Sequence, residues 1–410
     1  MSVIILNKMK NKNQKNRNLL EEKALTFDIA DKIQEAGLYP YFRAIESEQD
    51  TVVTMKGKKI LMFGSNSYLG LTCHPKIKEA AIAATKKYGT GCAGSRYLNG
   101  TLDIHLELEE KLAKFLGKEA AIVYSTGFQS NQGVIPTVIG RNDYVILDEL
   151  DHASIIEGAR LAFGKTFKFR HNDMEALENT LKRCEPNSIK LIVVDGVFSM
   201  EGDIINLPKV VELAEKYMAN IMVDDAHGMG VLGKNGAGTA SHFGLTDKVD
   251  IIMGTFSKSF APLGGVIASS ERIINFIKHN SRSLIFSASM TPAAAASVLA
   301  ALEIMQTEPE RMEHLMEMTR YTIKTFRELG FDIGHPETPI IPILIRDNIK
   351  TFIFTKRLMS EGVFVNPVVS PAVAENMTMV RFSLMATHTK EQIDEAIGKI
   401  TKVAKELEVI

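Results

Sequence analysis

The feature that most constrains the fold of this chain is a series of short apolar runs that alternate with amphipathic stretches. The runs lie at residues 120–125, 144–147, 191–195, 221–224 and 251–254. Near-continuous apolar runs of this length are typical of strands that are buried on both faces. Between the third and fourth runs, apolar side chains recur at helical spacing, and the last three runs are separated by about the interval that a βαβ unit needs. The sequence therefore predicts an α/β domain built on a mainly parallel sheet.

The last third of the chain has a different pattern. Residues 291–330 are predicted to be helical, and residues 340–345 and 378–384 to be strands of a smaller sheet. The C-terminal helix is predicted to begin with a capping box of Thr389 and Gln392, followed by an apolar stripe. At 410 residues the chain exceeds one average domain. We expect an N-terminal arm and segment at residues 1–58, a large domain at residues 59–285 and a small α+β domain at residues 286–410.

Charge and cysteine content narrow the class of protein. The formal net charge of -1 and the pI of about 6.8 give no electrostatic reason to expect nucleic acid as a partner. Cys73, Cys92 and Cys184 lack C-x-x-C spacing, as in a reduced cytoplasmic chain, and the histidines lack metal-ligand spacing. We therefore expect a cytoplasmic protein without a bound metal.

The N-terminal residues are basic and polar. Residues 1–20 contain no acid, and no apolar stretch follows the basic residues as it would in a signal peptide. No apolar run in the chain approaches the length of a membrane span. We predict a frayed or disordered arm and at most peripheral contact with the inner membrane face. A weak attraction of the arm to anionic lipid is the less favoured alternative, because the charges are few.

Two glycine-rich segments resemble nucleotide-binding motifs but lack their context. Residues 228–235 match a P-loop except that Asn235 replaces the hydroxyl residue that would hold magnesium, and no strong helix is expected after them. Gly89, Gly91 and Gly94 follow a helical segment, whereas a dinucleotide fingerprint follows a strand. Neither segment predicts a nucleotide site.

A phosphate site and a reactive lysine are predicted at two strand ends. Residues 125–133 follow a strand and open a helix, where Gly127 allows a close approach to backbone N–H groups. After the fifth run, Thr255 and Ser257 can donate to a phosphate. Lys258, among these small hydroxyl residues, is poorly explained as a surface charge. Desolvation would lower its pKa and free the amine for imine formation.

Two further strand ends carry groups that suit a pyridine ring. Asp224 can pair with a protonated ring nitrogen and so make the ring an electron sink, and His227 follows it closely. His152 follows the second run and could lie over an aromatic ring. Each residue alone is better explained as a helix cap or a packed histidine. All four features lie at strand ends, however, where open sheets bind ligands, and together they predict pyridoxal 5′-phosphate held by Lys258.

With these features the chain resembles the α-oxoamine synthases, fold-type I pyridoxal-phosphate enzymes that condense an amino acid with an acyl-CoA. The resemblance extends from about Gly37 to the C-terminus. It includes the segments at residues 64–70, 94–101, 196–202, 286–289 and 380–388. The lysine motif Gly-Thr-Phe-Ser-Lys-Ser is similar to that of the serine-using members, the soluble bacterial serine palmitoyltransferases. Relatives that use glycine or alanine tend to have Gly-Thr-Leu-Gly-Lys-Ala.

The chain departs from the family pattern at two places. Met290, Thr291 and Pro292 stand where many relatives have Leu-Pro-Pro, and Phe128 stands where tyrosine is common. These departures affect local packing and one hydroxyl contact.

The resemblance implies a role for each site residue. Lys258 would form the internal aldimine and later move the Cα proton, Asp224 would pair with the pyridinium, and His152 would stack on the ring. The substrate carboxylate would be bound by Arg381, with Asn66 beside it. The remaining cofactor contacts would be His227 and Ser199 near the 3-hydroxyl, Gly127, Phe128, Thr255 and Ser257 around the phosphate, and Ser287 reaching the phosphate from a second subunit.

The expected reaction is a decarboxylating condensation of L-serine with a long-chain acyl-CoA such as palmitoyl-CoA. It would yield 3-oxosphinganine, CoA and CO2, the first step of sphingolipid synthesis, in a homodimer with shared active sites. The alternatives are a glycine- or alanine-using synthase (2-amino-3-oxobutyrate CoA ligase or 8-amino-7-oxononanoate synthase) and a pyridoxal-phosphate aminotransferase. A catalytically silent subunit is a third alternative, against which the presence of Lys258 argues.

Overall fold

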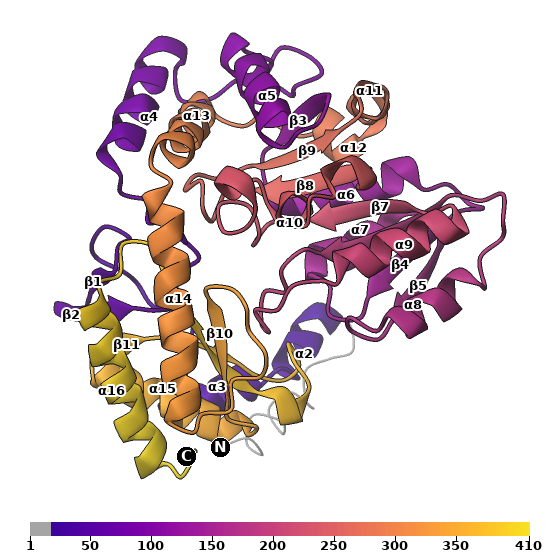
Figure 1. Cartoon of the computed structure of the whole chain (residues 1–410). Helices are drawn as coiled ribbons and strands as arrows, with labels where there is room; N and C mark the ends of the chain where they lie inside the picture. Colours follow the sequence, from indigo (N-terminus) through magenta and orange to yellow (C-terminus); the bar gives the residue numbers. More distant parts are fainter. Residues whose placement is uncertain (1–17) are drawn as a thin grey trace. The chain divides into compact units, whose positions relative to one another are not determined.

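The computed structural model describes residues 18–410, which form two compact units (Figure 1). The first ends at Arg43, and its described residues include the short helices α2 (Leu19–Leu25) and α3 (Ile29–Glu35). Asn18 caps α2, because its side chain accepts a hydrogen bond from the backbone N–H of Glu21. Most of the predicted basic arm, residues 1–17, lies outside the described residues. The second unit, Ala44–Ile410, contains all the residues of the predicted site.

A seven-stranded sheet is the centre of the second unit, in the part of the chain that the structure describes. Its order is β3-β9-β8-β7-β6-β4-β5. The strands are β3 (Ala120–Tyr124), β4 (Tyr144–Asp148), β5 (Lys165–Phe169), β6 (Lys190–Asp195), β7 (Asn220–Asp224), β8 (Ile251–Thr255) and β9 (Gly265–Ser269). Strands β5, β4, β6, β7 and β8 pair in parallel, and β9 runs antiparallel to both β8 and β3. The mainly parallel sheet and its five predicted strands are therefore confirmed.

Side chains on alternate positions of these strands face two helical layers. Val145 and Leu147 belong to one core cluster, and Ile146 between them belongs to the other. One layer consists of α6 (Gly127–Val138), α7 (Ala153–Leu161), α11 (Glu271–Asn280) and α12 (Arg282–Ile285). The other includes α5 (Asp103–Phe115), α8 (Met174–Leu181), α9 (Leu207–Tyr217) and α13 (Pro292–Thr307), with α4 (Pro75–Tyr88) packed on α13. This is an α/β fold whose sheet is covered on both faces.

Two small sheets lie outside the central sheet. The first has the order β1-β2-β11 and joins β1 (Val52–Met55) and β2 (Lys58–Met62) to β11 (Val363–Phe364). The second has the order β10-β13-β12 and consists of β10 (Ile340–Leu344), β12 (Asn366–Val368) and β13 (Met379–Ser383). The two predicted strands of the smaller sheet are thus confirmed as β10 and β13. The domain boundaries at residues 58 and 285 remain predictions.

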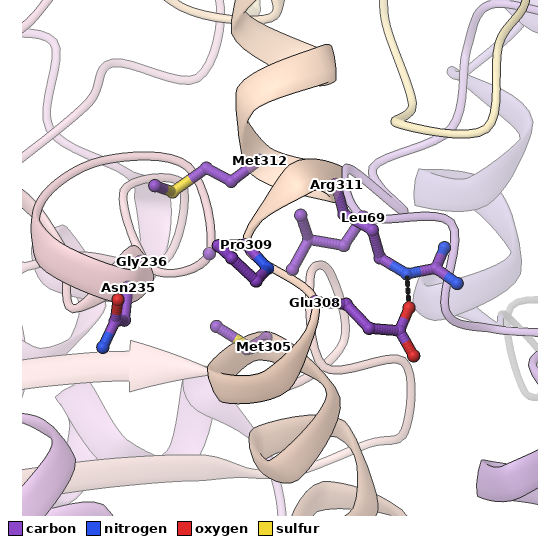
Figure 2. A pocket seen from close by; sticks show the side chains of 9 residues that line it. Leu69, Asn235, Gly236, Met305, Glu308, Pro309, Arg311 and Met312 are labelled. Carbon is purple, nitrogen blue, oxygen red and sulfur yellow. Dashed lines mark hydrogen bonds and ion pairs between the residues drawn. The ribbon is translucent and has the colours of Figure 1, made fainter.

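The helical region after residue 291 consists of two helices, α13 and α14 (Glu310–Glu328), with a break between them. The break is at Glu308 and Pro309, because proline cannot donate the hydrogen bond that continues a helix. Figure 2 shows the small cavity at this joint, which is lined by Met305, Pro309 and Met312 among other residues. The Arg311 Nε lies 2.6 Å from the Glu308 Oε2 beside it. The cavity volume of about 10 Å³ leaves room for one water at most.

The C-terminal helices complete the small-sheet region. They are α15 (Asn348–Ser360) and α16 (Lys390–Glu406), and Figure 1 shows α16 beside α14. The predicted capping box is confirmed, because Thr389 accepts from the backbone of Gln392 and the Gln392 side chain accepts from the backbone of Thr389. Three short helices, η2 (Lys234–Gly236), η3 (Thr246–Lys248) and η4 (Glu375–Met377), and the four-residue α10 (Thr239–His242) lie in loops. Within residues 18–410, no helix is long and apolar enough to cross a membrane.

Candidate active site

The predicted site residues come from the carboxyl ends of parallel strands. Asp224 is the last residue of β7, Lys258 lies three residues beyond the end of β8, and His152 stands between β4 and α7. Parallel strands bring their carboxyl ends to one edge of the sheet. The charges there affect one another: Asp224 raises the pKa of both Lys258 and His152, and Lys258 lowers that of His152. The structure therefore brings these three residues together.

Lys258 has the electrostatic setting of a reactive amine. Burial lowers its pKa most strongly, Asp224 and Asp195 act in the opposite direction, and Arg381 lowers it further, to about 8. A pKa of this size leaves a substantial neutral fraction of the amine near neutral pH, and the neutral amine is the nucleophile.

Asp224 is a buried carboxylate held by two donors. Only 2% of its surface is exposed. Its Oδ2 accepts from the Asn131 Nδ2 at 2.7 Å, and its Oδ1 accepts from the Ala226 backbone N–H at 3.0 Å. It pairs in register with Asp195 on the neighbouring strand β6, and each carboxylate lies in the field of Lys258. A carboxylate in this position can accept a hydrogen bond from a protonated pyridine nitrogen.

His152 is the N-cap residue of α7. Its Nδ1 accepts from the Ser154 backbone N–H at 3.2 Å and lies 2.7 Å from the Ser154 Oγ. Its own backbone N–H donates to the Asp195 Oδ2 at 2.9 Å. Desolvation within the site lowers the pKa of the imidazole, although Asp224 opposes the shift. The ring is therefore fixed at one edge by a helix terminus.

Tyr68 joins two of the predicted residues. Its side chain is fully buried, and its hydroxyl lies 2.6 Å from the His227 Nδ1. The Arg381 NH2 group donates to the same hydroxyl at 3.1 Å. The Tyr68 hydroxyl also lies 3.4 Å from the Asn66 Oδ1, which places Asn66 at the edge of this group. Burial, then Lys258 and Arg381, hold the pKa of His227 well below its usual range.

Arg381 is a buried cation whose hydrogen-bond partners are all neutral. It is 4% exposed, and its Nε donates to the backbone oxygen of Ser199 at 2.6 Å. Its two other nitrogens donate to the Ser383 Oγ and to Tyr68. The buried Arg96 differs, because it pairs with both carboxylate oxygens of Glu109, at 2.6 and 3.0 Å. Buried charges normally have a counter-ion, so the setting of Arg381 suits an anionic ligand.

The N-terminus of α6 forms the predicted phosphate end. Thr126 caps α6, and a Cβ on Gly127 would lie 2.7 Å from the Thr255 Cβ. Glycine at this position therefore allows β8 to approach the first turn of the helix. The Thr255 Oγ1 lies 3.2 Å from the Ser257 Oγ, so both hydroxyls are at the same end as Gly127. Phe128 is 42% exposed.

The donor set fits a pyridine that carries an aldehyde and a phosphate. The amine of lowered pKa matches the aldehyde, the buried carboxylate on the neighbouring strand matches the ring nitrogen, and the helix N-terminus with two hydroxyls matches the phosphate. The fit rests on the kind and position of these groups in one chain.

Ser287 lies near the same helix in its own chain. The Gln129 Nε2 donates to its Oγ at 2.9 Å, and the Ser125 Oγ donates to the neighbouring Ala288 carbonyl. Ser287 is not a cap of α13, because Thr291 is the N-cap of that helix and accepts a hydrogen bond from the Ala294 backbone.

Sequence reasoning missed several buried polar residues around the site. Tyr68, Asn131 and Ser154 bond directly to predicted site residues. Asp225 is fully buried and accepts from the Thr239 N–H and hydroxyl at 2.7 and 2.6 Å, which ties down the loop that carries His227. Burial, opposed by these hydrogen bonds, raises the pKa of Asp225 to about 7. Tyr68 and Asn131 lie inside segments that the resemblance includes, and that was the available signal.

Comparison with known proteins gives a consistent result. The family model described as aminotransferase class I and II matches residues 58–400. A serine palmitoyltransferase of Sphingobacterium spiritivorum is 61% identical over 95% of this chain and 98% of its own length. One of Bacteroides ovatus is 57% identical over 96% of this chain and its whole length. An 8-amino-7-oxononanoate synthase of Symbiobacterium thermophilum is 45% identical over 92% of this chain and 97% of its own length.

Solved structures agree with the sequence relatives. A serine palmitoyltransferase structure described as holding the pyridoxal-phosphate internal aldimine matches with a TM-score of 0.93 and 33% identity. The match covers 96% of this chain and all of that one. The serine palmitoyltransferase of Sphingomonas wittichii matches with the same TM-score, identity and coverage. The fold-type I architecture is therefore confirmed.

Proposed function

Since this chain belongs to the aminotransferase class I and II family and, within it, to the α-oxoamine synthases, we propose that it is a pyridoxal 5′-phosphate-dependent serine C-palmitoyltransferase. It condenses L-serine with a long-chain acyl-CoA and releases CoA and CO2. The product of palmitoyl-CoA is 3-oxosphinganine, so the enzyme carries out the first step of sphingolipid synthesis. The observation that carries this function is the 61% identity to a serine palmitoyltransferase over 95% of the chain.

Bound pyridoxal phosphate supplies an aldehyde for the substrate amine and a ring that takes up negative charge from Cα. The Lys258 Nζ presents a partly neutral amine, and in this proposal it takes the Cα proton. The Asp224 carboxylate would pair with the ring nitrogen of the cofactor and so keep that nitrogen protonated. In the overall reaction the Cα–H bond breaks and Cα bonds to the acyl carbonyl carbon. The C–S bond then breaks and CoA leaves, the carboxylate leaves as CO2, and a proton returns to Cα.

Arg381 holds the serine carboxylate in this scheme, with Asn66 close to it. The support is the buried guanidinium whose partners are neutral. Tyr68 fixes the guanidinium and the imidazole of His227 through one hydroxyl, so these two cofactor- and substrate-facing groups keep a constant separation. Ser199, through its backbone oxygen, fixes the other edge of the guanidinium.

The homodimer with shared active sites is part of this proposal. Tyr97, Leu98, Phe128 and Phe286 are exposed large apolar side chains. They come from segments that hydrogen bonds tie together, since the Ser289 N–H donates to the Gly94 carbonyl and Gln129 bonds Ser287. Exposed apolar side chains on neighbouring segments suit a self-complementary interface with a second copy. Ser287 follows Phe286 directly in the chain and would reach the phosphate of the partner.

We place the enzyme in the cytoplasm, with at most peripheral contact with the inner membrane face. The three cysteines are free thiols in the structure, as suits a reducing compartment. The acyl-CoA substrate is an amphiphile, which gives a reason for weak membrane contact. Cell fractionation followed by a salt wash separates the possibilities: the protein should appear in the soluble fraction after the wash.

Product analysis tests the function. Purified enzyme loaded with pyridoxal phosphate is incubated with serine, glycine or alanine, each against short- and long-chain acyl-CoA. We expect a 3-oxo long-chain base with serine and palmitoyl-CoA, together with stoichiometric CoA. Preferred use of alanine with a dicarboxylic acyl-CoA, or of glycine with acetyl-CoA, would indicate one of the other synthases. Amino transfer to a keto acid without acyl-CoA would indicate an aminotransferase.

A further inference from the structure

The contacts of His152 allow only one position for its proton. The Ser154 backbone N–H donates to the Nδ1 at 3.2 Å, as the first turn of α7 requires. A backbone N–H can only donate, so the Nδ1 must present its lone pair. A proton on Nδ1 would point at this N–H and at the positive end of the helix dipole.

A second series of hydrogen bonds, which starts at Asn131, also ends with a donor that faces the His152 Nδ1. The Asn131 Nδ2 lies 2.7 Å from the Asp224 Oδ2 and 2.8 Å from the Ser154 Oγ. An ionised carboxylate only accepts, so the amide nitrogen, with its two protons, must be the atom that faces both oxygens. The Asn131 Oδ1 points away, is buried and has no hydrogen-bond partner among the described residues.

The hydroxyl proton of Ser154 then has one acceptor at short range. Since the Ser154 Oγ accepts from Asn131, its own proton is free to bond the His152 Nδ1, which lies 2.7 Å away. Two donors therefore point at the Nδ1 and none of the neighbours accepts from it. The residues involved are buried: Asn131 is 0% and Ser154 2% exposed.

We propose that Asn131 and Ser154 are positioning residues that keep His152 neutral, with its proton on Nε2, and that link this tautomer to the ionised state of Asp224. This inference rests on the proposed function, because it concerns the protonation state in which His152, the residue proposed to stack on the ring, contacts the cofactor and the substrate. His152 then offers an N–H donor from Nε2 and carries no positive charge beside Lys258.

The charged groups around the imidazole agree with this assignment. Of the charges that act on the imidazole, Lys258 disfavours a second cation and Asp224 favours one. Asp195, at the end of β6, accepts a hydrogen bond from the backbone N–H of His152 and not from its imidazole. Desolvation and Lys258 outweigh Asp224, so the pKa of His152 is lowered.

The test is nitrogen NMR of the full-length protein labelled with 15N-histidine, with and without pyridoxal phosphate. The His152 signals are assigned by their loss in His152→Gln. We expect an unprotonated Nδ1 and a protonated Nε2 from about pH 6 to pH 8, within the range where an ordinary histidine titrates. A protonated Nδ1 in the wild-type protein would overturn the proposal.

Two variants separate positioning from plain packing. Ser154→Ala removes one donor to the Nδ1, so the imidazole should take up a proton at higher pH than in the wild type. The rate constant kcat/KM for serine should fall roughly three- to tenfold, the value of one hydrogen bond. Asn131→Asp turns the donor into an acceptor for the Ser154 hydroxyl and should shift the His152 titration further in the same direction.

Ser297→Ala is the matched control. Ser297 is also buried, at 5% exposure, but its hydroxyl donates to the Ala293 carbonyl within α13. It should leave the His152 signals and the pH profile unchanged. Unchanged His152 titration in both site variants would defeat the positioning role. Because the NMR signals do not depend on which substrates are used, a failure of the proposed function would show in the product analysis and leave this result intact.

Discussion

Lys258 and Arg381 are two cations on different elements of one site. Arg381 contributes to the low pKa of Lys258, after the larger effect of burial. Each has a setting that matches a different demand, since a nucleophilic amine needs a low pKa and a carboxylate ligand needs a permanent cation. The substrate carboxylate would neutralise Arg381 and so change the field that Lys258 experiences.

Lys258→Ala should abolish both turnover and the retained visible absorbance of the cofactor, because no other amine in the described site is placed to hold the aldehyde. The measurement is the absorption spectrum after gel filtration. In the wild type, the rate of cofactor capture should rise as the pH passes through about 8, because the neutral amine attacks. A variant that keeps the absorbance after filtration would sink the assignment.

Arg381→Ala should weaken serine binding much more than acyl-CoA binding, by roughly 2–5 kcal/mol for a desolvated pair. The apparent KM of each substrate is the measurement, made after circular dichroism confirms the fold. Arg381→Lys keeps the charge but loses the fork that bonds Ser199, Ser383 and Tyr68, so it should recover only part of the loss. Equal losses for both substrates would identify a structural arginine.

The sequence predicted the residues whose chemistry is conspicuous and missed those that hold them. Asp224 and Lys258 follow apolar runs, so their position at the sheet edge could be inferred. Asn131 contacts Asp224 from 93 residues away and Tyr68 contacts His227 from 159 residues away. Pairings of this kind depend on how helices and loops pack over the sheet, which local patterns do not specify. The roles assigned to the individual site residues stay predictions.

At the scale of elements, the segment at residues 197–204 depends on a histidine outside the site. This segment closes through the bridge between Val197 and Ile204, and it carries Ser199, the acceptor for Arg381. The His171 Nε2 lies 2.9 Å from the Asp203 Oδ2, and its Nδ1 lies 3.1 Å from the Asp148 Oδ1 at the end of β4. Burial alone would lower the His171 pKa, but the two carboxylates outweigh it and raise the pKa to about 10. The protonated imidazole of His171 therefore joins the segment at residues 197–204 to the end of β4.

His171→Gln should destabilise the protein by about 1–3 kcal/mol, because two carboxylates lose a shared, partly buried cation. The folded protein holds the His171 proton more tightly than the unfolded chain does. The stabilisation is thus fully present below about pH 6.5 and is lost as the pH rises through about 10. Urea unfolding across this range should show the wild type and the variant converging at high pH. His242→Gln, at an exposed histidine, is the control and should lack this trend.

Element prediction succeeded where one pattern ran through a whole segment. The five buried runs are β3, β4, β6, β7 and β8. Strand β5 was missed because Lys165 and Lys168 interrupt its apolar pattern at the edge of the sheet. Strand β9 follows the lysine loop directly, and its antiparallel direction depends on pairing with both β8 and the distant β3.

At the scale of the whole molecule, the exposed apolar side chains of Tyr97, Leu98, Phe128 and Phe286 make the single chain an incomplete unit in the proposed dimer. Ser287 follows Phe286, and its hydroxyl accepts a hydrogen bond from Gln129 of its own chain in the structure. Ser287 can therefore act within its own chain or across an interface. The two possibilities predict different activities when two inactive variants are combined in one dimer.

Lys258→Ala mixed with a chain altered at Ser287 should regain activity if Ser287 acts across the interface. One site of the heterodimer then combines the intact Lys258 of one chain with the intact Ser287 of the other. The measurement is the turnover of heterodimers purified through two different tags. Verified heterodimers without any recovered activity would defeat the shared site.

The strand order has a consequence for the sequence of events during synthesis. Strand β3 is made early, but its one neighbour in the sheet is β9, whose residues 265–269 leave the ribosome about 145 residues later. The N-terminus of α6, which follows β3, cannot reach its final place against Thr255 before that moment. Arg381 on β13 appears later still, after the chain has passed the break at Pro309. A nascent chain therefore completes the residues proposed to hold the cofactor before it has made Arg381, the cation proposed to hold the carboxylate of the amino acid.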